Sequence, residues 1–292
     1  MFMFDALAHT IPDQHFLIQN ISVTVRRLDL VHPHISGNKF FKLKYNFLDA
    51  QRAGYHQLLT FGGAYSNHIA ATAFAAHQFD FKSVGIIRGA ELKDKELNPT
   101  LALAQELGMQ LHFFSREEYQ RRHQPDYLQE LTQQFPEHYL IPEGGTNTLA
   151  IQGCREILRP DDEQFDVICC AVGTGGTLTG LIEASHPHQQ LLGFSALKGD
   201  FLKDEVAKFT VKKNWSILDD YCCSGYAKTT PALIQFIQDF EAKYDIPLEQ
   251  VYTGKMLMGL FELITQGYFP AGSKLLVIHT GGLQAKNLKT CS

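Results

Sequence analysis

The chain has 292 residues, 45% of them hydrophobic and 20% charged, which is enough apolar material to bury a large core. Lysine and arginine number 26 against 31 acidic residues, so the net charge is 26 − 31 = −5, and no basic block occurs. This charge argues against nucleic acid or an anionic membrane surface as partner. We expect no signal peptide and no membrane span, because no segment reaches the roughly 18 apolar residues that a span needs.

The cysteine and histidine patterns point to neither disulfides nor metal. Six cysteines occur, at positions 154, 169, 170, 222, 223 and 291, with two adjacent pairs and no C-x-x-C spacing. The 13 histidines show no H-E-x-x-H or similar ligand spacing. We therefore expect reduced thiols, a cytoplasmic location and no bound metal.

Strand-like and helix-like segments alternate along the chain. Hydrophobic periodicity predicts strands at residues 21–25, 57–61, 83–87, 110–114, 139–141, 165–172, 191–195 and 274–279. It predicts helices from Lys39 onward and at 69–76, 98–107, 116–138 (in large part), 148–158, 178–184, 230–243 and 255–265. Residues 199–229 have no clear pattern, apart from an extended segment at 221–226. This alternation predicts an α/β fold with open, twisted, mostly parallel sheets and flanking helices.

A lysine follows a turn at the start of the first predicted helix. Ser36, Gly37 and Asn38 favour a turn and a helix cap, and Lys39 comes directly after them. The positive end of a helix disfavours an ammonium group, so its field would lower the pKa of Lys39. A neutral amine is the form that attacks an aldehyde, which makes Lys39 a candidate for carbonyl chemistry. A solvated lysine at a helix start is the alternative.

Three glycine-rich turns follow predicted strands, at Gly62–Gly63, Gly173–Gly176 and Gly281–Gly282. Ligands of parallel sheets bind at the carboxyl ends of strands, where such turns gather. The turn at 173–176 precedes a helix, so its backbone N–H groups and the helix dipole favour a phosphate. Leu178 breaks the dinucleotide pattern G-x-G-x-x-G, and no P-loop lysine follows, so we expect a single phosphate. A tight strand-to-helix turn is the alternative.

Ser66 and Asn67 lie at another predicted helix start. A serine there caps the helix, and the free N–H groups beside it can bind a carboxylate. Capping alone is the alternative.

Four segments together resemble a known family. They are residues 36–42, 62–68, 173–177 and 251–255, and they occur in the order seen in the 1-aminocyclopropane-1-carboxylate (ACC) deaminase/D-cysteine desulfhydrase family. Its members are enzymes of the tryptophan-synthase-β fold, type II, that use pyridoxal 5′-phosphate (PLP). The resemblance spans about residues 26–282. It implies a large PLP-binding domain (1–41 with 148–292), a small domain (42–147), an active site in the cleft between them, and a homodimer.

The resemblance also assigns roles to single residues. Lys39 would bind the aldehyde of PLP covalently and later move the α-proton of a small amino-acid substrate. Asn67 would bond the phenolic oxygen, Tyr252 would lie by the pyridine ring, and Thr253 would face its nitrogen. The phosphate would be held by Gly173, Thr174, Gly175, Gly176 and Thr177. Substrate contacts would come from Asn38, Tyr65, Ser66, Asn67, His68 and Tyr226. Lys42 would add charge near the phosphate, although a surface role is equally consistent with the sequence.

The residue after Tyr252 bears on the reaction. A carboxylate facing the pyridine nitrogen keeps it protonated and strengthens the electron sink, which cyclopropane opening needs. Thr253 offers a hydroxyl instead, which suffices when a β-thiol leaves. We therefore expect a D-cysteine desulfhydrase-like lyase that releases pyruvate, ammonia and sulfide. The alternatives are an ACC deaminase, a PLP-binding protein acting on another D-amino acid or without turnover, and a nucleotide-binding module, which Leu178 disfavours.

Three positions depart from the family pattern. Tyr65 replaces the glutamine that commonly precedes the serine, residues 225–228 differ from Tyr-Gly-x-Pro, and residues 282–285 differ from Gly-x-Pro-Ala. All three changes would face the substrate, and Tyr65 would enlarge and cap the site. The natural substrate can therefore differ from both namesakes.

Overall fold

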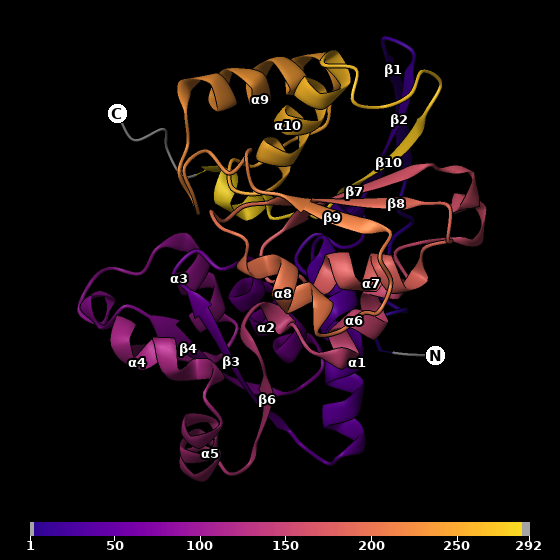
Figure 1. The fold of residues 1–292 in the computed structure, drawn as a ribbon. Helices are drawn as coiled ribbons and strands as arrows, with labels where there is room; N and C mark the ends of the chain where they lie inside the picture. The colour runs from indigo at the N-terminus through magenta and orange to yellow at the C-terminus, as the bar shows by residue number, and fades with distance from the viewer. Residues whose placement is uncertain (1–2, 288–292) are drawn as a thin grey trace.

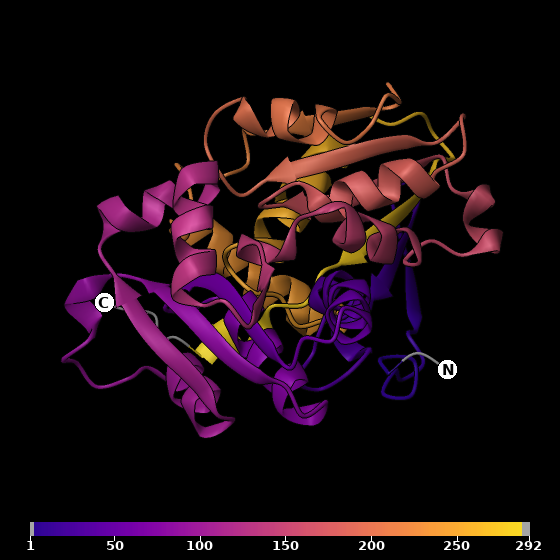
Figure 2. The ribbon, with the colours of Figure 1, turned by 90° about the horizontal axis from the view of Figure 1, so that it is seen from below.

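The computed structural model describes residues 3–287, so Cys291 lies outside the described part of the chain. Within that part the strands form a six-stranded and a four-stranded sheet, which are two separate layers in Figures 1 and 2. The large sheet has the order β1-β2-β10-β7-β8-β9 and the small sheet β5-β4-β3-β6. Only β1 is antiparallel to its neighbour; all other pairs are parallel. This architecture confirms the predicted α/β fold.

The large sheet consists of β1 (Asp13–Ile18), β2 (Ile21–Arg27), β7 (Val167–Val172), β8 (Gln190–Ser195), β9 (Trp215–Leu218) and β10 (Lys274–His279). The small sheet consists of β3 (Gln57–Gly63), β4 (Lys82–Arg88), β5 (Met109–Phe114) and β6 (His138–Ile141). The helices of eight or more residues are α1 (Asn38–Arg52), α2 (Asn67–Gln78), α3 (Pro99–Glu106), α5 (Pro125–Gln134), α6 (Thr148–Arg155), α7 (Gly176–Ala184), α9 (Pro231–Tyr244) and α10 (Thr253–Thr265). Shorter helices are α4 (Arg116–Gln120) and α8 (Phe201–Ala207).

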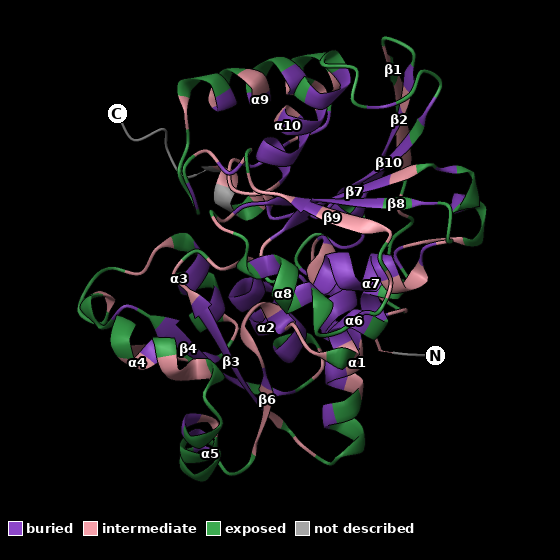
Figure 3. Cartoon of the chain, viewed as in Figure 1, coloured by how far each residue is buried: buried purple, intermediate pink, exposed green. Residues whose placement is uncertain are grey.

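Helices cover both faces of each sheet. Helices α7 and α8 lie on one face of the large sheet, together with α1 and α6, and α9 and α10 cover the other. In the small sheet, α2 and α3 share one apolar cluster, and α5 contributes to the cluster on the opposite face. Figure 3 shows the result, with central strands buried and the outer surface of α9 exposed. Because both faces are covered, the inner strands are nearly continuous apolar runs.

The strand orders place two topological switch points at the carboxyl ends of the sheets. In the large sheet, β7 continues through α7 to β8 on one side, whereas β10 adjoins β7 on the other. In the small sheet, β3 continues to β4 on one side and adjoins β6 on the other. Crevices at such points are where parallel sheets bind ligands. The three glycine turns follow β3, β7 and β10, the strands that flank these points.

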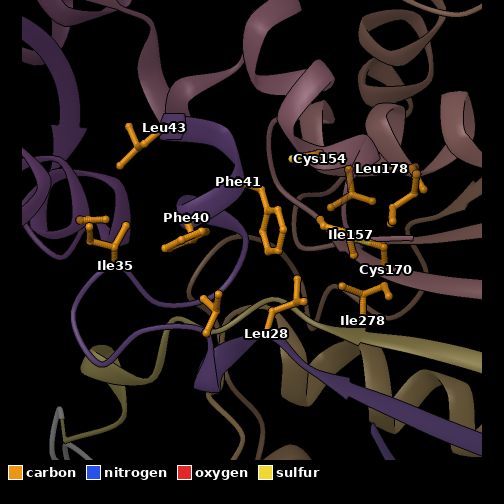
Figure 4. Close-up of a cluster of buried hydrophobic side chains, with 14 of the residues drawn as sticks. Leu28, Ile35, Phe40, Phe41, Leu43, Cys154, Ile157, Cys170, Leu178 and Ile278 are labelled. Carbon is orange, nitrogen blue, oxygen red and sulfur yellow. The ribbon is translucent and has the colours of Figure 1, made fainter. Parts of the chain in front are cut away.

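Helix α1 lies between the two sheets and packs against both α2 and α6. Its Phe40 and Phe41 enter a core cluster with Leu28, Cys170 and Ile278 (Figure 4). Gly153 of α6 lets the helices approach closely, because a Cβ there would lie 2.0 Å from the carbonyl oxygen of Phe41. The predicted domain boundary after residue 41 falls inside α1, and the division into two domains stays a prediction.

Two sequence expectations differ from the structure. Residues 221–226 form turns, not an extended segment, because Cys223 and Ser224 adopt positive φ angles of 52° and 69°. The neighbouring strand is β9, and α8 also lies in the stretch without a clear pattern. The predicted helix at 116–138 is broken at Pro125 into α4, a 3₁₀ turn and α5, and it ends before β6. Strand β1 was missed, because its burial is partial.

Among the helices of residues 3–287, none has the length and apolar character needed to cross a membrane.

Candidate active site

The turn before Lys39 is fixed against the end of β10. Gly37 has φ +68°, and a Cβ there would lie 2.0 Å from the carbonyl oxygen of Thr280. The Asn38 N–H donates to that same oxygen at 3.1 Å. Glycine is therefore required at position 37 both by the backbone angle and by the close approach. The contact places Lys39, in the first turn of α1, at the carboxyl end of the large sheet.

A two-bond chain joins the lysine to the glycine-rich turn after β7. Lys39 Nζ donates to Asn38 Oδ1 at 3.0 Å, and Asn38 Nδ2 donates to Thr177 Oγ1 at 2.8 Å. Burial lowers the pKa of Lys39 to about 8. The direction agrees with the sequence argument, but burial is its main cause. The amine is thus held beside the turn in a form that loses its proton readily.

The turn of Gly173 to Thr177 is shaped for an anion. Gly175 has φ +82° and precedes α7, whose first backbone N–H groups have no helical acceptors. A Cβ on Gly173 would lie 3.0 Å from the ring of Tyr252, and one on Gly176 would lie 2.9 Å from Thr146 Oγ1. Side chains at these glycines would crowd Tyr252 and Thr146, so the close packing of this turn depends on glycine. Thr177 is buried, and Thr174 is exposed at the rim.

A second lysine, which is buried, lies beside this turn. Lys42 Nζ donates to the carbonyl oxygen of Gly144 at 2.5 Å, to Thr146 Oγ1 at 2.8 Å and to Thr174 Oγ1 at 3.3 Å. Burial, with the nearby charge of Lys39, lowers the pKa of Lys42 to about 7. Lys42 is only 2% exposed, so the surface role that the sequence left open is excluded. Sequence reasoning did not find Thr146, which contacts Lys42 although it lies 104 residues further along the chain.

The loop after β3 brings a second set of predicted residues to the small sheet's carboxyl edge. Ser66 caps α2 by accepting from the N–H groups of His68 and Ile69 at 3.2 and 3.3 Å. Asn67 Oδ1 is buried and has no hydrogen-bond partner among the described residues. A Cβ on Gly282 would lie 2.5 Å from Asn67 Nδ2, so the third glycine turn contacts this loop. Tyr65 lies at the rim and is 48% exposed.

His68 points into the protein below this loop. Thr60 donates its hydroxyl proton to Ile141, so His68 Nε2, 2.7 Å from Thr60 Oγ1, is the protonated nitrogen. His68 Nδ1 is then an acceptor, buried and without a partner in the described residues. Burial, and then the charges of Lys39 and Lys42, lower the pKa of His68 well below its usual value. His68 is therefore neutral.

The predicted tyrosines lie on the large-sheet side. Tyr252 contacts Gly173, and burial followed by the charge of Tyr226 raises the pKa of its hydroxyl, which stays protonated. The rings of Tyr226 and Tyr252 are 6.1 Å apart at 66°. Tyr226 is 46% exposed, so it lies at the protein surface, whereas Tyr252 is the more buried of the two tyrosines.

Thr253 begins α10 and is fully buried. Its Oγ1 donates to Glu249 Oε1 at 3.1 Å, and it accepts from the Glu249 N–H at 3.1 Å. Glu249 also accepts from the N–H groups of Val251, Tyr252 and Thr253 at 2.6–2.7 Å. Burial raises the pKa of Glu249. Sequence reasoning missed Glu249, although an acidic residue shortly before a helix start is a capping signal.

Comparisons with known proteins identify the class. A model of the family described as pyridoxal-phosphate-dependent enzymes matches residues 19–281, so the chain belongs to that family. A provisionally named ACC deaminase of Thermotoga maritima is 32% identical over 284 residues, which cover 90% of this chain and 89% of the relative. The bifunctional D-cysteine desulfhydrase/ACC deaminase of Arabidopsis thaliana is 30% identical over 289 residues, covering 89% and 72%. The solved structure of an ACC deaminase homologue is 27% identical with a TM-score of 0.78, covering 95% and 90%.

Within the PLP-dependent enzymes, the chain therefore belongs to the ACC deaminase/D-cysteine desulfhydrase family. The predicted family, the type II fold and the cofactor are confirmed. The residues present fit PLP. The glycine turn at 173–176 lies next to the half-buried Lys39 and the buried Lys42, neither of which has a carboxylate partner in residues 3–287, and Asn67 Oδ1 lacks a partner there. The role of each site residue stays a proposal.

Proposed function

We propose that this chain is a PLP-dependent lyase that eliminates the β-substituent of a small amino acid and deaminates it, as a D-cysteine desulfhydrase does. D-cysteine and water would yield pyruvate, ammonia and hydrogen sulfide, so the C–S and C–N bonds break without an oxidant. The observation that carries this proposal is Thr253. The residue that begins α10 beside Tyr252 carries a hydroxyl that already donates to Glu249, and not a free carboxylate, which suits a substrate whose thiol leaves readily.

The first requirement is to hold the cofactor. The backbone N–H groups of Gly173 to Thr177 and the Lys42 ammonium would bind its phosphate, because unpaired N–H groups at a helix start and a buried cation both favour an anion. Lys39 would hold the aldehyde end. The Lys39–Asn38–Thr177 chain supports this, because it keeps the amine close to the cradle.

The second requirement is a base. When bound, PLP supplies an electron sink that stabilises negative charge at the substrate α-carbon. Lys39 would take the α-proton, and its lowered pKa makes the amine an effective base near neutral pH. Tyr252, which keeps its proton, is the donor available beside Gly173 for the leaving thiolate.

The third requirement is to orient the substrate. The start of α2 at Ser66 and Asn67 would bind the carboxylate, since its N–H groups carry partial positive charge. The substrate site would be bounded on its inner side by two further residues. These are Asn38, which bonds to Lys39, and the neutral His68. Tyr65 and Tyr226 would cover the mouth, where both are partly exposed.

The test is a product screen on the PLP-saturated protein. We expect pyruvate and sulfide from D-cysteine, the same two products more slowly from L-cysteine, slow pyruvate release from D-serine, whose hydroxide leaves poorly, and pyruvate with chloride from β-chloro-alanine. Lys39→Ala should lower the rate about 10³-fold, within the range for loss of an acid–base group, and remove the visible absorbance of lysine-bound PLP. Lys95→Ala, at an exposed lysine, is the matched control and should leave both unchanged. Absence of the absorbance in wild type, or its survival in Lys39→Ala, would overturn the assignment.

ACC deamination is the second candidate, and Glu249 is the observation that favours it. A carboxylate lies one hydrogen bond behind Thr253, where it can offset positive charge. Release of 2-oxobutanoate from the cyclopropane substrate faster than pyruvate from D-cysteine would select this reaction. Glu249→Gln separates the candidates further, because it removes that charge and should slow cyclopropane opening more than β-elimination.

A further inference from the structure

A hollow lined by arginines lies at the carboxyl edge of the small sheet. Its volume is about 370 Å³, and its lining residues are Arg88, Arg116, Tyr119, Gln120 and Arg122. Arg88 is the last residue of β4, and its Nη2 lies 3.8 Å from the position that a Cβ on Gly63 would occupy. Gly63 ends β3, directly before the loop that carries Ser66. We call this the arginine hollow.

The charges around the arginine hollow do not balance. Arg116 pairs with Glu91 at 3.0 Å, and Arg122 Nε donates to Glu143 at 2.6 Å. The Arg88 side chain has no hydrogen bond or ion pair within residues 3–287, whereas its backbone belongs to β4. The hollow therefore has three guanidinium groups but only two paired carboxylates, Glu91 and Glu143. The excess positive charge is that of Arg88.

The neighbouring acceptors are already engaged. Tyr119 donates its hydroxyl proton to Glu143 at 2.6 Å, so Glu143 accepts from both Tyr119 and Arg122. Arg122 Nη1 donates to the carbonyl oxygen of Tyr119 at 3.0 Å. These bonds hold Arg122 against Glu143 and Tyr119, whereas the Arg88 side chain is exposed and makes no hydrogen bond or ion pair within residues 3–287. The guanidinium groups of Arg122 and Arg88 line the same hollow, so together they can donate to two or more oxygens of one anion.

We propose that the arginine hollow binds a small anion that carries carboxylate or phosphate oxygens. Arg88 would be its main ligand, with Arg116 and Arg122 supplying further charge and Gln120 an amide. The site is separate from the PLP phosphate cradle, which lies at the end of β7. Its existence does not depend on which reaction the enzyme catalyses.

The hollow is connected to the active site through one loop. Glu143, which binds Arg122, is followed by Gly144, whose carbonyl oxygen accepts from Lys42 Nζ. The charge of Glu143 also contributes to the raised pKa of Tyr252, after burial, Tyr226 and Glu249. An anion that draws Arg122 away from Glu143 would therefore act on both Lys42 and Tyr252.

The test uses the PLP-saturated enzyme, so that the cradle is filled. Calorimetric titration with inorganic phosphate and with succinate, at constant ionic strength set by chloride, should show saturable binding. Arg88→Gln should weaken binding about tenfold or more, as expected for loss of a charged hydrogen-bond donor. The affinity of Arg88→Lys should lie between those of wild type and Arg88→Gln, because lysine keeps the charge but not the paired N–H donors of a guanidinium. Arg52→Gln, at an exposed arginine that ends α1, is the control and should bind like wild type.

Kinetics separates the two sources of the anion. If succinate raises KM for the amino acid without changing kcat, the hollow receives an acidic group of the substrate itself. If it changes kcat or the PLP absorbance without competition, the anion is a separate regulator. The absence of saturable binding to wild type, or equal affinities of wild type and a folded Arg88→Gln, would overturn the proposal.

Discussion

Buried cations occur in two regions of this molecule, and the two regions treat them differently. In β2 of the large sheet, Arg26 donates to Asp13 at 3.0 and 2.7 Å and to Asp162 at 2.5 and 2.8 Å. Burial alone would lower the pKa of Arg26, but the two carboxylates raise it overall. At the carboxyl end of the same sheet, Lys39 and Lys42 have no carboxylate partner among the described residues, and burial lowers their pKa values.

The contrast separates structure from function. A cation paired with acids is satisfied by the fold and needs nothing more. A half-buried lysine and a buried lysine that bond only carbonyl, hydroxyl and amide oxygens leave positive charge uncompensated when protonated, and that charge favours an anionic ligand. The phosphate of PLP is such a ligand. The comparison therefore predicts which substitutions affect stability and which affect cofactor binding.

The largest effect should follow removal of a satisfied cation. Arg26→Ala leaves Asp162 buried without its partner, so we expect a loss of about 3–5 kcal/mol in the free energy of unfolding. Urea unfolding of the PLP-free protein measures it. Arg52→Ala, at an exposed site, should change stability by no more than about 0.5 kcal/mol. A loss below 1 kcal/mol for Arg26→Ala would show that the two regions do not differ as argued.

Lys42→Met should affect cofactor binding and not stability, the reverse of what we expect for Arg26→Ala. Removing an uncompensated buried cation should leave the PLP-free protein as stable or more stable, whereas PLP affinity should fall about 10- to 100-fold. Absorbance titration with PLP measures the affinity. Lys44→Met is the matched control from the same helix, because Lys44 pairs with Asp5 and Glu156. It should lose stability and keep its PLP affinity, and the opposite result for either variant would contradict the comparison.

The same lysines predict a pH dependence of moderate size. Lys42 has a pKa of about 7 in the folded protein against 10.5 for an ordinary lysine, so the unfolded chain binds more protons between these values. Stability of the PLP-free protein should therefore rise with pH from about 7 to about 10.5, by at most about 1.4 kcal/mol per unit for one proton. The difference between wild type and Lys42→Met, measured across this range, isolates the contribution. A flat difference would exclude the lowered pKa.

Local patterns were enough to predict the architecture. The strands that carry the glycine turns are apolar runs, and each turn is encoded beside its strand, so the fold class and the segments at 36–42, 62–68 and 173–177 were found. Strand β9 has four residues, and β1 is half-exposed, so neither pattern was distinct. Residues 221–226 were misassigned because positive φ angles at Cys223 and Ser224 are unusual for these residue types.

Contacts between segments far apart in the chain could not be predicted from the sequence. Lys42 was left open between the phosphate and the surface, because its partners Gly144 and Thr146 lie more than 100 residues away. Lys39 was expected to have a lowered pKa from the helix field, whereas burial in the assembled fold is the main cause. Arg88 gave no signal, since its significance lies in the absence of a partner within residues 3–287.

The smallest predicted effect extends the comparison from cations to helix caps. Ser66 caps α2 with bonds of 3.2 and 3.3 Å, and Thr230 caps α9 with a bond of 3.1 Å from Leu233. Each alanine variant should lose about 1 kcal/mol of stability. Only Ser66→Ala should also raise KM for the amino acid, because its hydroxyl lies where the substrate carboxylate would bind, whereas Thr230 belongs to a helix outside the site. Thermal unfolding and steady-state kinetics on both variants measure this. If Ser66→Ala changes stability alone, Ser66 is a cap and nothing more.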